Sequence, residues 1–334
     1  MDLRQARLDD GDALAALALA SADTGRVRVS PRYLRNPVEA FASLVPELTW
    51  VVAEEKGSLV GAAAYATDEE REVEGERYPG AMLGSLMVHP AHRRRGVARA
   101  LTEWRLERIG PDAIVVAAIQ TGNEGSFANA RKWSTQIFGS LLIPLFPPAD
   151  DYTGPAVREP EGDDEWEAYA EGLAAFERGW NLRTPETGAS LRERSGRTLD
   201  GERFRHAYVA VESGRVVGGI ELFESGRLQT IVIEHLPPEL RVLNVLLRLV
   251  PPEGELIETG TSRFWFERVD VGRALWAFAR ATAAKRANTV ATQFDPRGPL
   301  SAVIRVRPWT PKGRIAIAVR SPVPLDEARL LSPP

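Results

Sequence analysis

The most informative stretch of this sequence spans residues 86–101 and reads Leu86-Met87-Val88-His89-Pro90-Ala91-His92-Arg93-Arg94-Arg95-Gly96-Val97-Ala98-Arg99-Ala100-Leu101. An apolar strand pattern is followed by a polar turn, three arginines and a glycine, and an alanine-rich helical pattern begins at once. The first N–H groups of a helix have no partner of their own and carry the positive end of its dipole. Gly96 has no Cβ to block a ligand, and neighbouring arginines can bind phosphate oxygens. These residues predict a pyrophosphate site, with a solvated surface turn as the alternative.

The composition excludes several classes of function. The chain has 334 residues, of which 44% are hydrophobic, so two cores are the default expectation. A formal net charge of −4 argues against a general nucleic-acid binder, because such proteins need a basic face. The sequence has no cysteine, which excludes disulfides and a cysteine nucleophile, and its four histidines lack metal-ligand spacing, so we expect no metal.

The chain shows no signal-peptide pattern at Met1 and no apolar run of about 20 residues. We therefore expect a cytoplasmic protein that has neither a membrane nor a nucleic acid as a partner.

The first 146 residues alternate between strand and helix patterns. The predicted elements are a strand at 3–7, a helix capped by Asp9 or Asp10, a helical stretch at 30–44, a hairpin at 49–54 and 59–65, an exposed charged turn or strand end at 68–77, strands at 81–88 and 113–119, a helix at 124–133 and a strand at 136–146. A linker rich in proline and glycine is expected at 147–156.

The sequence then repeats. Residues 157–164 echo 3–10, and residues 208–218 echo the hairpin around Gly57 and Gly61. Gly57 pairs with Gly214 and Gly61 with Gly218 at the same shift of 157 residues (214 − 57 = 218 − 61). The repeat predicts two similar domains in tandem, at 1–146 and 157–322, with a C-terminal tail at 323–334.

The pattern Arg93-x-x-Gly96-x-Ala98, placed between a strand ending Val88-x-Pro90 and a helix, resembles the acyl-CoA loop of the GNAT superfamily of N-acyltransferases. The motif of that superfamily reads Gln/Arg-x-x-Gly-x-Gly/Ala. The resemblance implies an α/β (α+β) fold in which each domain is a mixed, mostly antiparallel twisted sheet flanked by helices. The tandem arrangement resembles that of the mycothiol synthases.

The same resemblance implies a cofactor site. The backbone of Leu86, Met87 and Val88 would pair with the pantetheine arm of acetyl-CoA, and Asn123 would contact the cofactor. The loop residues Arg93, Arg94, Arg95, Gly96, Val97 and Ala98 would hold the pyrophosphate. The reaction would be direct attack of an amine on the thioester, with a backbone N–H near Val88 stabilising the carbonyl oxygen.

The acid and the base of the reaction stay open. The superfamily often has a tyrosine seven residues beyond the asparagine, where this chain has Ala130, and a carboxylate on the strand before the loop, where it has Gly84 and Ser85. The weak candidates are Glu76, with its neighbours Glu72 and Glu74, then Ser85 and His89; solvated surface positions are the alternative for the acids and the histidine. We interpret Ser126 as a helix cap and Trp133 as core.

Two registers compete for the second copy of the loop, 237–241 and 271–275. We prefer the second, because Val271 and Leu275 mirror Val97 and Leu101. In that register Glu267 takes the place of Arg93 and Asp270 that of Gly96, and these carboxylates would repel a pyrophosphate. A helix near 238–250 would then be an insertion.

The sequence thus favours an acetyl-CoA-dependent N-acetyltransferase that works in its first domain on an amine of a small molecule or peptide, as a monomer or homodimer. A non-catalytic acyl-CoA-binding or sensing protein is the alternative, motivated by Ala130 and the missing carboxylate. A catalytic second domain is a third possibility. The acceptor is not specified.

Overall fold

The computed structural model describes residues 1–21, 27–45, 47–67, 70–149, 151–238, 241, 244 and 254–333. The elements of its first half are β1 (Asp2–Gln5), α1 (Gly11–Ala20), β2 (Arg28–Tyr33), α2 (Pro37–Leu44), β3 (Thr49–Glu55), β4 (Ser58–Ala66), β5 (Glu70–Val73), β6 (Glu76–Val88), α3 (Val97–Ile109), β7 (Ile114–Gln120), α4 (Glu124–Ala130) and β8 (Gln136–Phe146).

The second half starts with a short strand and returns to the same alternation. Its elements are β9 (Val157–Arg158), α5 (Gly162–Phe176), α6 (Gly188–Gly196), β10 (Thr198–Leu199), β11 (Glu202–Arg203), β12 (Arg205–Glu212), β13 (Arg215–Phe223), β14 (Gln229–His235), β15 (Glu255–Leu256), β16 (Glu258–Phe266), α8 (Val269–Ala283), β17 (Thr289–Thr292) and β18 (Lys312–Arg320).

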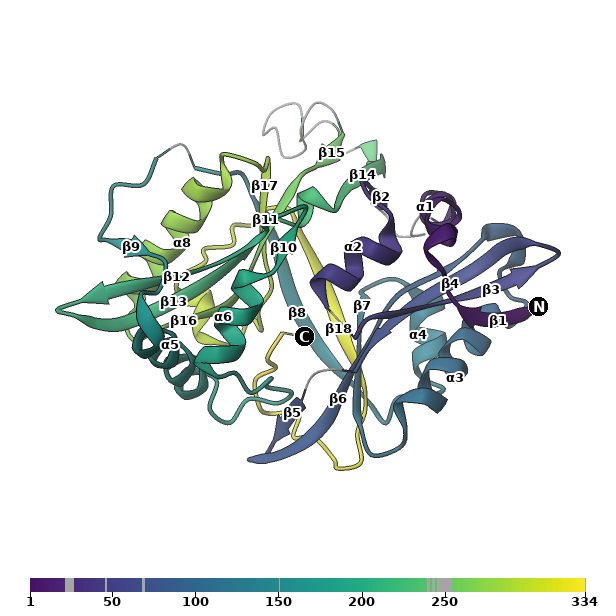
Figure 1. Ribbon diagram of the computed structural model, residues 1–334, viewed down its shortest axis with the longest axis horizontal. Coiled ribbons are helices and arrows are strands. Elements are labelled where there is room, and N and C mark those ends of the chain that lie inside the picture. Colours follow the sequence, from purple (N-terminus) through teal and green to yellow (C-terminus); the bar gives the residue numbers. More distant parts are fainter. Residues whose placement is uncertain are drawn as a thin grey trace.

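One twisted sheet runs through both halves (Figure 1). Within the described residues its order is β1-β3-β4-β6-β7-β18-β8-β17-β16-β13-β12-β9, with β5 paired to β6. The pairs β6–β7 and β16–β17 are parallel and the others are antiparallel, so each half has a mixed, mostly antiparallel sheet. The predicted fold class of two tandem α/β domains is confirmed.

The predicted repeat appears in the register of the two hairpins. Ala53 lies opposite Gly61 in β3–β4, and Ala210 lies opposite Gly218 in β12–β13. A bulge follows at the same step in both hairpins, so the shift of 157 residues holds in three dimensions.

The sequence did not reveal that β18 crosses between the halves. This strand falls in the range expected for the second domain, yet it lies between β7 and β8. Ile315 pairs with Gln120 on one side and with Leu141 on the other. The strand β8 therefore joins the first domain through β18 and meets β17 of the second on its far edge.

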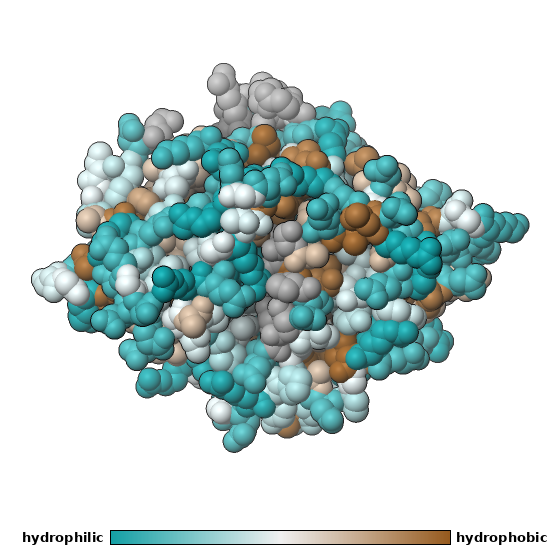
Figure 2. Space-filling view, in the orientation of Figure 1, coloured by the Kyte–Doolittle hydropathy of each residue, from teal (hydrophilic) through white to brown (hydrophobic). Residues whose placement is uncertain are grey.

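The strand β2 also pairs with the other half of the chain, and the helical stretch predicted at 30–44 is therefore wrong in its first part. Residues 28–33 form a strand that pairs with β14 of the second half, Tyr33 lying opposite Gln229. The helix begins only at Pro37, where Asn36 accepts a hydrogen bond from the N–H of Val38 at 3.0 Å. Figure 2 shows a largely hydrophilic face with apolar residues gathered near its middle, around β2 and α2.

Two smaller expectations also differ, and a third is not tested. Asp10 does not cap α1 with its side chain, because Arg4 binds its carboxylate at 2.7 and 2.8 Å. The segment 323–334 is more than a tail, since Leu325 and Leu331 are buried in the core of the first half. The insertion predicted near 238–250 lies almost wholly outside the described residues.

Candidate active site

The strands β6 and β7 separate at the centre of the first domain. They pair from Gly80 to Leu83 and from Ile114 to Ala117, and the pairing stops there. Just beyond it, Ala63 of β4 faces two residues of β6, because Ala62 pairs with Met87 and Ala64 with Gly84. This bulge leaves Ser85 at a φ of +49°. Bulges bend a strand, so β6 leaves β7 and a notch opens between them.

A buried arginine holds the bulge from the side of α3. Arg105 is 2% exposed and donates to the carbonyl oxygens of Ala64 at 2.8 Å and Gly84 at 3.3 Å. Its Nη2 also donates to the hydroxyl of Thr102, which in turn accepts from Asn129 of α4 at 2.9 Å. No carboxylate in the described part of the chain pairs with this guanidinium, and burial lowers its pKa to about 10.

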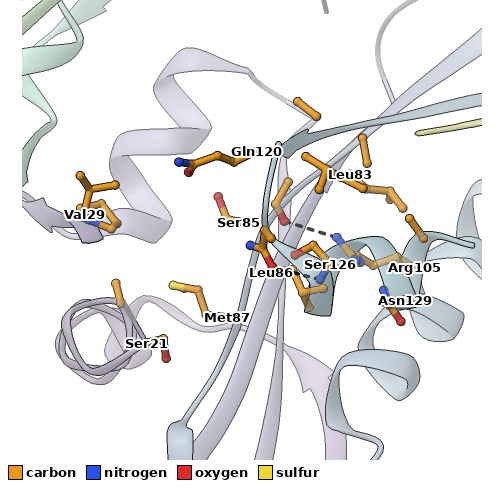
Figure 3. Close-up of a pocket in the computed structure, with 18 of the residues that line it drawn as sticks. Ser21, Val29, Leu83, Ser85, Leu86, Met87, Arg105, Gln120, Ser126 and Asn129 are labelled. Carbon is orange, nitrogen blue, oxygen red and sulfur yellow. Dashed lines mark hydrogen bonds between the residues drawn. The ribbon is translucent and has the colours of Figure 1, made fainter. Parts of the chain in front are cut away.

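A cavity of about 450 Å³ occupies the notch (Figure 3). Ser85 and Gln120 extend into it from the two diverging strands, while Arg105 approaches from the opposite wall. The lining comes from both halves of the chain, since Gln229 and Ile231 of β14 complete it. No aspartate or glutamate occurs among the described residues that line this cavity.

A second opening, of about 560 Å³, adjoins the first. The two share Ser21, Leu86, Met87, Asn123, Ser126 and Asn129, and so form one continuous path. Its described lining includes the cations Arg93, Arg94, Arg99 and Lys132, without a carboxylate. We call this opening the basic groove.

Gly96 places the start of α3 at the basic groove. It is the residue before the helix and has a φ of +85°, a conformation that favours glycine. Val97 is buried against Gly61, so the helix starts close to the sheet. The free N–H groups of the first turn and the helix dipole therefore lie beside three arginines, as expected for a site that binds phosphate.

Most of the residues predicted for the cofactor line the basic groove. They are Leu86, Met87, Val88, Arg93, Arg94, Gly96, Val97, Ala98 and Asn123. Arg95 does not line it, because its guanidinium turns away to the carboxylate of Glu55 at 3.1 Å. Lys132, at the end of α4, lines the groove and was not predicted.

At the start of α4, the helix cap is Asn123 and not Ser126, which the sequence predicted as the cap. Asn123 is the cap, since its Oδ1 accepts from the N–H of Ser126 at 3.1 Å. Ser126 is not a cap and lines both openings, and Trp133 is only partly buried and borders the notch cavity. Asn123 thus orients the helix that walls the groove while it also borders the path itself.

Of the weak catalytic candidates, only Ser85 reaches the notch cavity. Glu76 lies nine residues before Ser85 on the same strand, roughly 30 Å away at the rise of an extended chain, because β6 continues past the sheet into a hairpin with β5. Glu72 and Glu74 of this hairpin form ion pairs with Arg183 and Arg329.

His89 is likewise absent from the described lining of both openings. Its Nδ1 accepts from the N–H of Ala91 at 3.3 Å and so caps the turn after β6. His92, three residues later, borders the basic groove and contacts Glu55.

Tyr33 is a residue of the site that sequence reasoning missed. It lies on β2, lines the notch cavity and packs edge-on against Phe41 with ring centroids 5.7 Å apart. Burial raises the pKa of its phenol, so the group stays protonated and can donate a hydrogen bond. The interpretation of 30–44 as helix hid it, since only the pairing of β2 with β14 directs residues 29, 31 and 33 toward the notch.

Comparison with known proteins agrees with this geometry. Residues 16–132, which contain the notch and the basic groove, match the family described as the acetyltransferase (GNAT) family. The first domain is a GNAT domain. No curated protein sequence matches the chain significantly.

Solved structures extend the likeness over both halves. N-myristoyltransferase from Saccharomyces cerevisiae, with bound myristoyl-CoA, has a TM-score of 0.64 and 9% identity, covering 99% of this chain and 83% of that chain. GCN5-related N-acetyltransferases from Kribbella flavida (TM-score 0.51, 18% identity, 95% and 71% covered) and Anabaena variabilis (0.52, 15%, 95% and 72%) are also similar. At these identities the likeness shows the fold, a tandem pair of GNAT-like domains. No helix in the described residues is long and apolar enough to cross a membrane.

The structure supports the preferred register for the second, GNAT-like domain. Gly61 packs against Val97 and Leu101 of α3, and Gly218 packs in the same way against Val271 and Leu275 of α8. The alternative loop at 237–241 does not lead directly into α8, because β15 and β16 come between them in the chain.

The loop itself is much shorter in the second domain than in the GNAT domain. Residues 89–96 separate β6 from α3, whereas 267–268 alone separate β16 from α8. Glu267 donates its N–H to Val217 as His89 does to Val60, both at 3.0 Å, so Glu267 corresponds to His89 and the expected match with Arg93 is wrong. The second domain has thus lost the loop together with its glycine.

The notch of the second domain is also nearly filled. Arg263 has a φ of +47° at the position that corresponds to Ser85, so the bulge is retained. The remaining cavity is about 90 Å³ and is lined in part by Ser332 and Pro333 from the end of the chain.

Glu177 borders this small cavity and gives a pH-dependent prediction. Burial raises its pKa to about 7, outweighing the favourable charges of Arg263 and Arg183, while Glu186 opposes ionisation and Ser332 donates to it at 3.3 Å. The folded state then binds the proton more tightly than the unfolded state, so the contribution of Glu177 to stability falls as pH rises from about 4.5 through 7. Glu177→Gln should stabilise the protein at pH 8 by on the order of 1–3 kcal/mol and have little effect at pH 5, measured by urea unfolding.

Glu171→Gln, an exposed change on α5, which ends one residue before Glu177, is the matched control for the loss of one carboxylate. A Glu177→Gln protein that is less stable than the parent at pH 8 would contradict the prediction.

Proposed function

We propose that this protein is an N-acetyltransferase that uses acetyl-CoA and works in its first domain. The observation that carries the proposal is the single path formed by the basic groove and the notch cavity, which meet at Leu86, Met87 and Asn123. A long cofactor with an anionic end and a reactive end fits a path that is cationic at the groove and has Arg105 as the one charged residue in the described lining of the notch.

The groove would bind the cofactor through its backbone and cations. Residues 94–98 would hold the pyrophosphate at the start of α3. Residues 86–88 would pair with the pantetheine arm, because no described strand pairs with β6 beyond Leu83 on the β7 side. The second domain supports this placement of the site in the first domain, since its loop is short and its notch holds about 90 Å³ against about 450 Å³.

The notch cavity favours an acceptor amine with an apolar body. Its described lining includes Val29, Phe41 and Ile231 and has no carboxylate, so nothing there compensates the several charges of a polyamine or aminoglycoside. The charged residue in the described lining of the cavity is a cation, Arg105, and the adjoining groove adds Arg93 and Arg94. They disfavour an ammonium ion and so favour the neutral amine, which is the form that attacks.

In the reaction, the amine nitrogen attacks the thioester carbonyl carbon, and the carbon–sulfur bond breaks as the amide forms. The nitrogen loses one proton and the departing thiolate gains one. Tyr33 is the group we assign to this transfer because its phenol lines the notch cavity: the phenol gives a proton to the sulfur as it recovers one from the nitrogen, so that no free phenolate forms. This residue would act where the GNAT superfamily often uses the tyrosine that Ala130 replaces.

The test is steady-state release of free CoA from acetyl-CoA with a panel of amines that includes phenethylamine and spermidine. We expect phenethylamine to be used with a kcat/KM at least about tenfold higher than spermidine, and Tyr33→Phe to lower kcat about 100-fold with unchanged affinity for acetyl-CoA. Tyr65→Phe, a change on β4 outside the described lining of both openings, is the control.

The other outcomes separate the alternatives. Binding of acetyl-CoA without release of CoA for any amine would favour a non-catalytic acyl-CoA-binding or sensing protein. Absence of binding would reject both functions, and faster turnover with spermidine would reject the apolar acceptor alone.

A further inference from the structure

A third large cavity, of about 540 Å³, lies where the end of β8 meets α8 and the segment before β18. Its floor is buried and apolar, formed by Leu256, Trp276 and Val303. Phe146 packs against Trp276 with ring centroids 5.3 Å apart and forms one wall. We call this opening the arginine pocket because of its rim.

The rim carries three arginines and an exposed indole. Arg280 lies over the ring of Phe146 and donates to the carbonyl of Pro147 at 3.0 Å, and Arg307 lies 5.5 Å from the ring centre of Trp309. Trp309 is 51% exposed, unusual for so large an apolar side chain. Arg305, also exposed, completes the rim.

The charge on the rim of the arginine pocket is not balanced locally. Several exposed arginines elsewhere on the second half pair with carboxylates, as in Arg192–Asp163, Arg203–Glu159, Arg215–Glu267, Arg268–Glu212 and Arg286–Glu224. Among the described residues, Arg280, Arg305 and Arg307 form no ion pair, and no carboxylate lines the pocket. Three like charges around one cavity repel one another, and a bound anion would relieve this repulsion.

We infer that the arginine pocket is a second ligand site, for a small anion that carries a planar aromatic ring, such as a nucleoside monophosphate. The ring would stack on Trp309 or enter the apolar floor, and the phosphate would accept charge-assisted hydrogen bonds from Arg305 and Arg307. A volume of about 540 Å³ is within the range of small-ligand sites. This site is separate from the basic groove, since the described linings have no residue in common.

The probes are AMP, adenosine and inorganic phosphate, and their binding is followed by isothermal titration and by the intrinsic tryptophan fluorescence of the protein, to which Trp309 contributes. All titrations are made with the Gly96→Glu protein, so that AMP does not enter the basic groove. We expect AMP to bind at least about tenfold more tightly than adenosine or phosphate, because only AMP uses both the ring and the arginines. Arg305→Gln combined with Arg307→Gln should weaken AMP at least tenfold, and Trp309→Phe should remove the fluorescence change.

Arg192→Gln combined with Arg215→Gln removes two exposed, ion-paired arginines elsewhere and should leave AMP binding unchanged. The inference is overturned if phosphate alone binds as tightly as AMP, if AMP does not bind, or if the double change at Arg305 and Arg307 has no effect. Acetyl-CoA binding by the parent protein is a separate measurement, so failure here leaves the proposed acetyltransferase activity standing.

Discussion

A chain ending at Pro148 should fail to fold, although it contains every strand and helix that the sequence assigns to the first domain. The fragment lacks β18, which pairs with both β7 and β8. It also loses the buried side chains Ile315, Ile317, Val319, Leu325 and Leu331. Burial of one large aliphatic side chain contributes roughly 1.5–3 kcal/mol. Five of them amount to roughly 7–15 kcal/mol, which is about the whole stability of a typical domain. Circular dichroism and urea unfolding should show no cooperative transition.

A split chain provides the control for this truncation. When residues 1–148 and 149–334 are produced together as two polypeptides, the break is at the same place but β18 is still supplied. We expect the pair to associate and to unfold cooperatively. A lone fragment 1–148 with a cooperative transition and the acetyl-CoA affinity of the whole chain would contradict the assignment of β18 to the first domain.

The second large effect is expected for Gly96→Glu, which should weaken acetyl-CoA binding at least 100-fold. The new carboxylate would lie at the start of α3, where the pyrophosphate is proposed to bind. Two like charges about 4 Å apart near a protein surface repel by about 4 kcal/mol, and 1.4 kcal/mol corresponds to tenfold in affinity. Isothermal titration with acetyl-CoA measures the effect.

Backbone strain has to be separated from charge in this experiment. Gly96 and Gly214 both have a positive φ, +85° and +76°, and neither has a heavy atom within 4 Å of the place of a Cβ. Gly214→Glu, at the turn of the second hairpin, should therefore cost similar stability without changing the affinity for acetyl-CoA. Gly96→Ala should bind within about tenfold of the parent. Equal losses for Gly96→Ala and Gly96→Glu would show that strain, and not charge, is responsible.

Local features of the fold were predictable from the sequence. The hairpins around Gly57 and Gly214 depend on residues close together in the chain, and both were predicted with the correct register of the repeat. The pairings of β2 with β14 and of β18 with β7 join residues that are 195 (315 − 120) to 207 (235 − 28) positions apart in the chain. Residues 28–33 carry no local signal for such a partner, so the apolar positions near Pro31 were interpreted as helix.

In the candidate site, too, the parts built from consecutive residues were predictable and the parts built by distant strand pairings were not. The loop from Arg93 to Ala98 was predictable because a phosphate site on a helix start is built from consecutive residues. Arg105 was missed although a signal existed, since it stands four residues after Leu101 on the buried stripe of α3. Tyr33 had no such signal, because its place in the notch depends on a strand pairing with the other half of the chain.

The position of β18 has a consequence for biosynthesis. The strand β18 leaves the ribosome 192 residues after the end of β7 (312 − 120). Until then the first domain is incomplete, and the edges of β7 and β8 that β18 will join are unpaired. At about 5–20 residues per second, this interval lasts roughly 10–40 s. During that time the exposed edges of β7 and β8 can pair with other nascent chains, which makes the domain that emerges first the one in greater need of a chaperone.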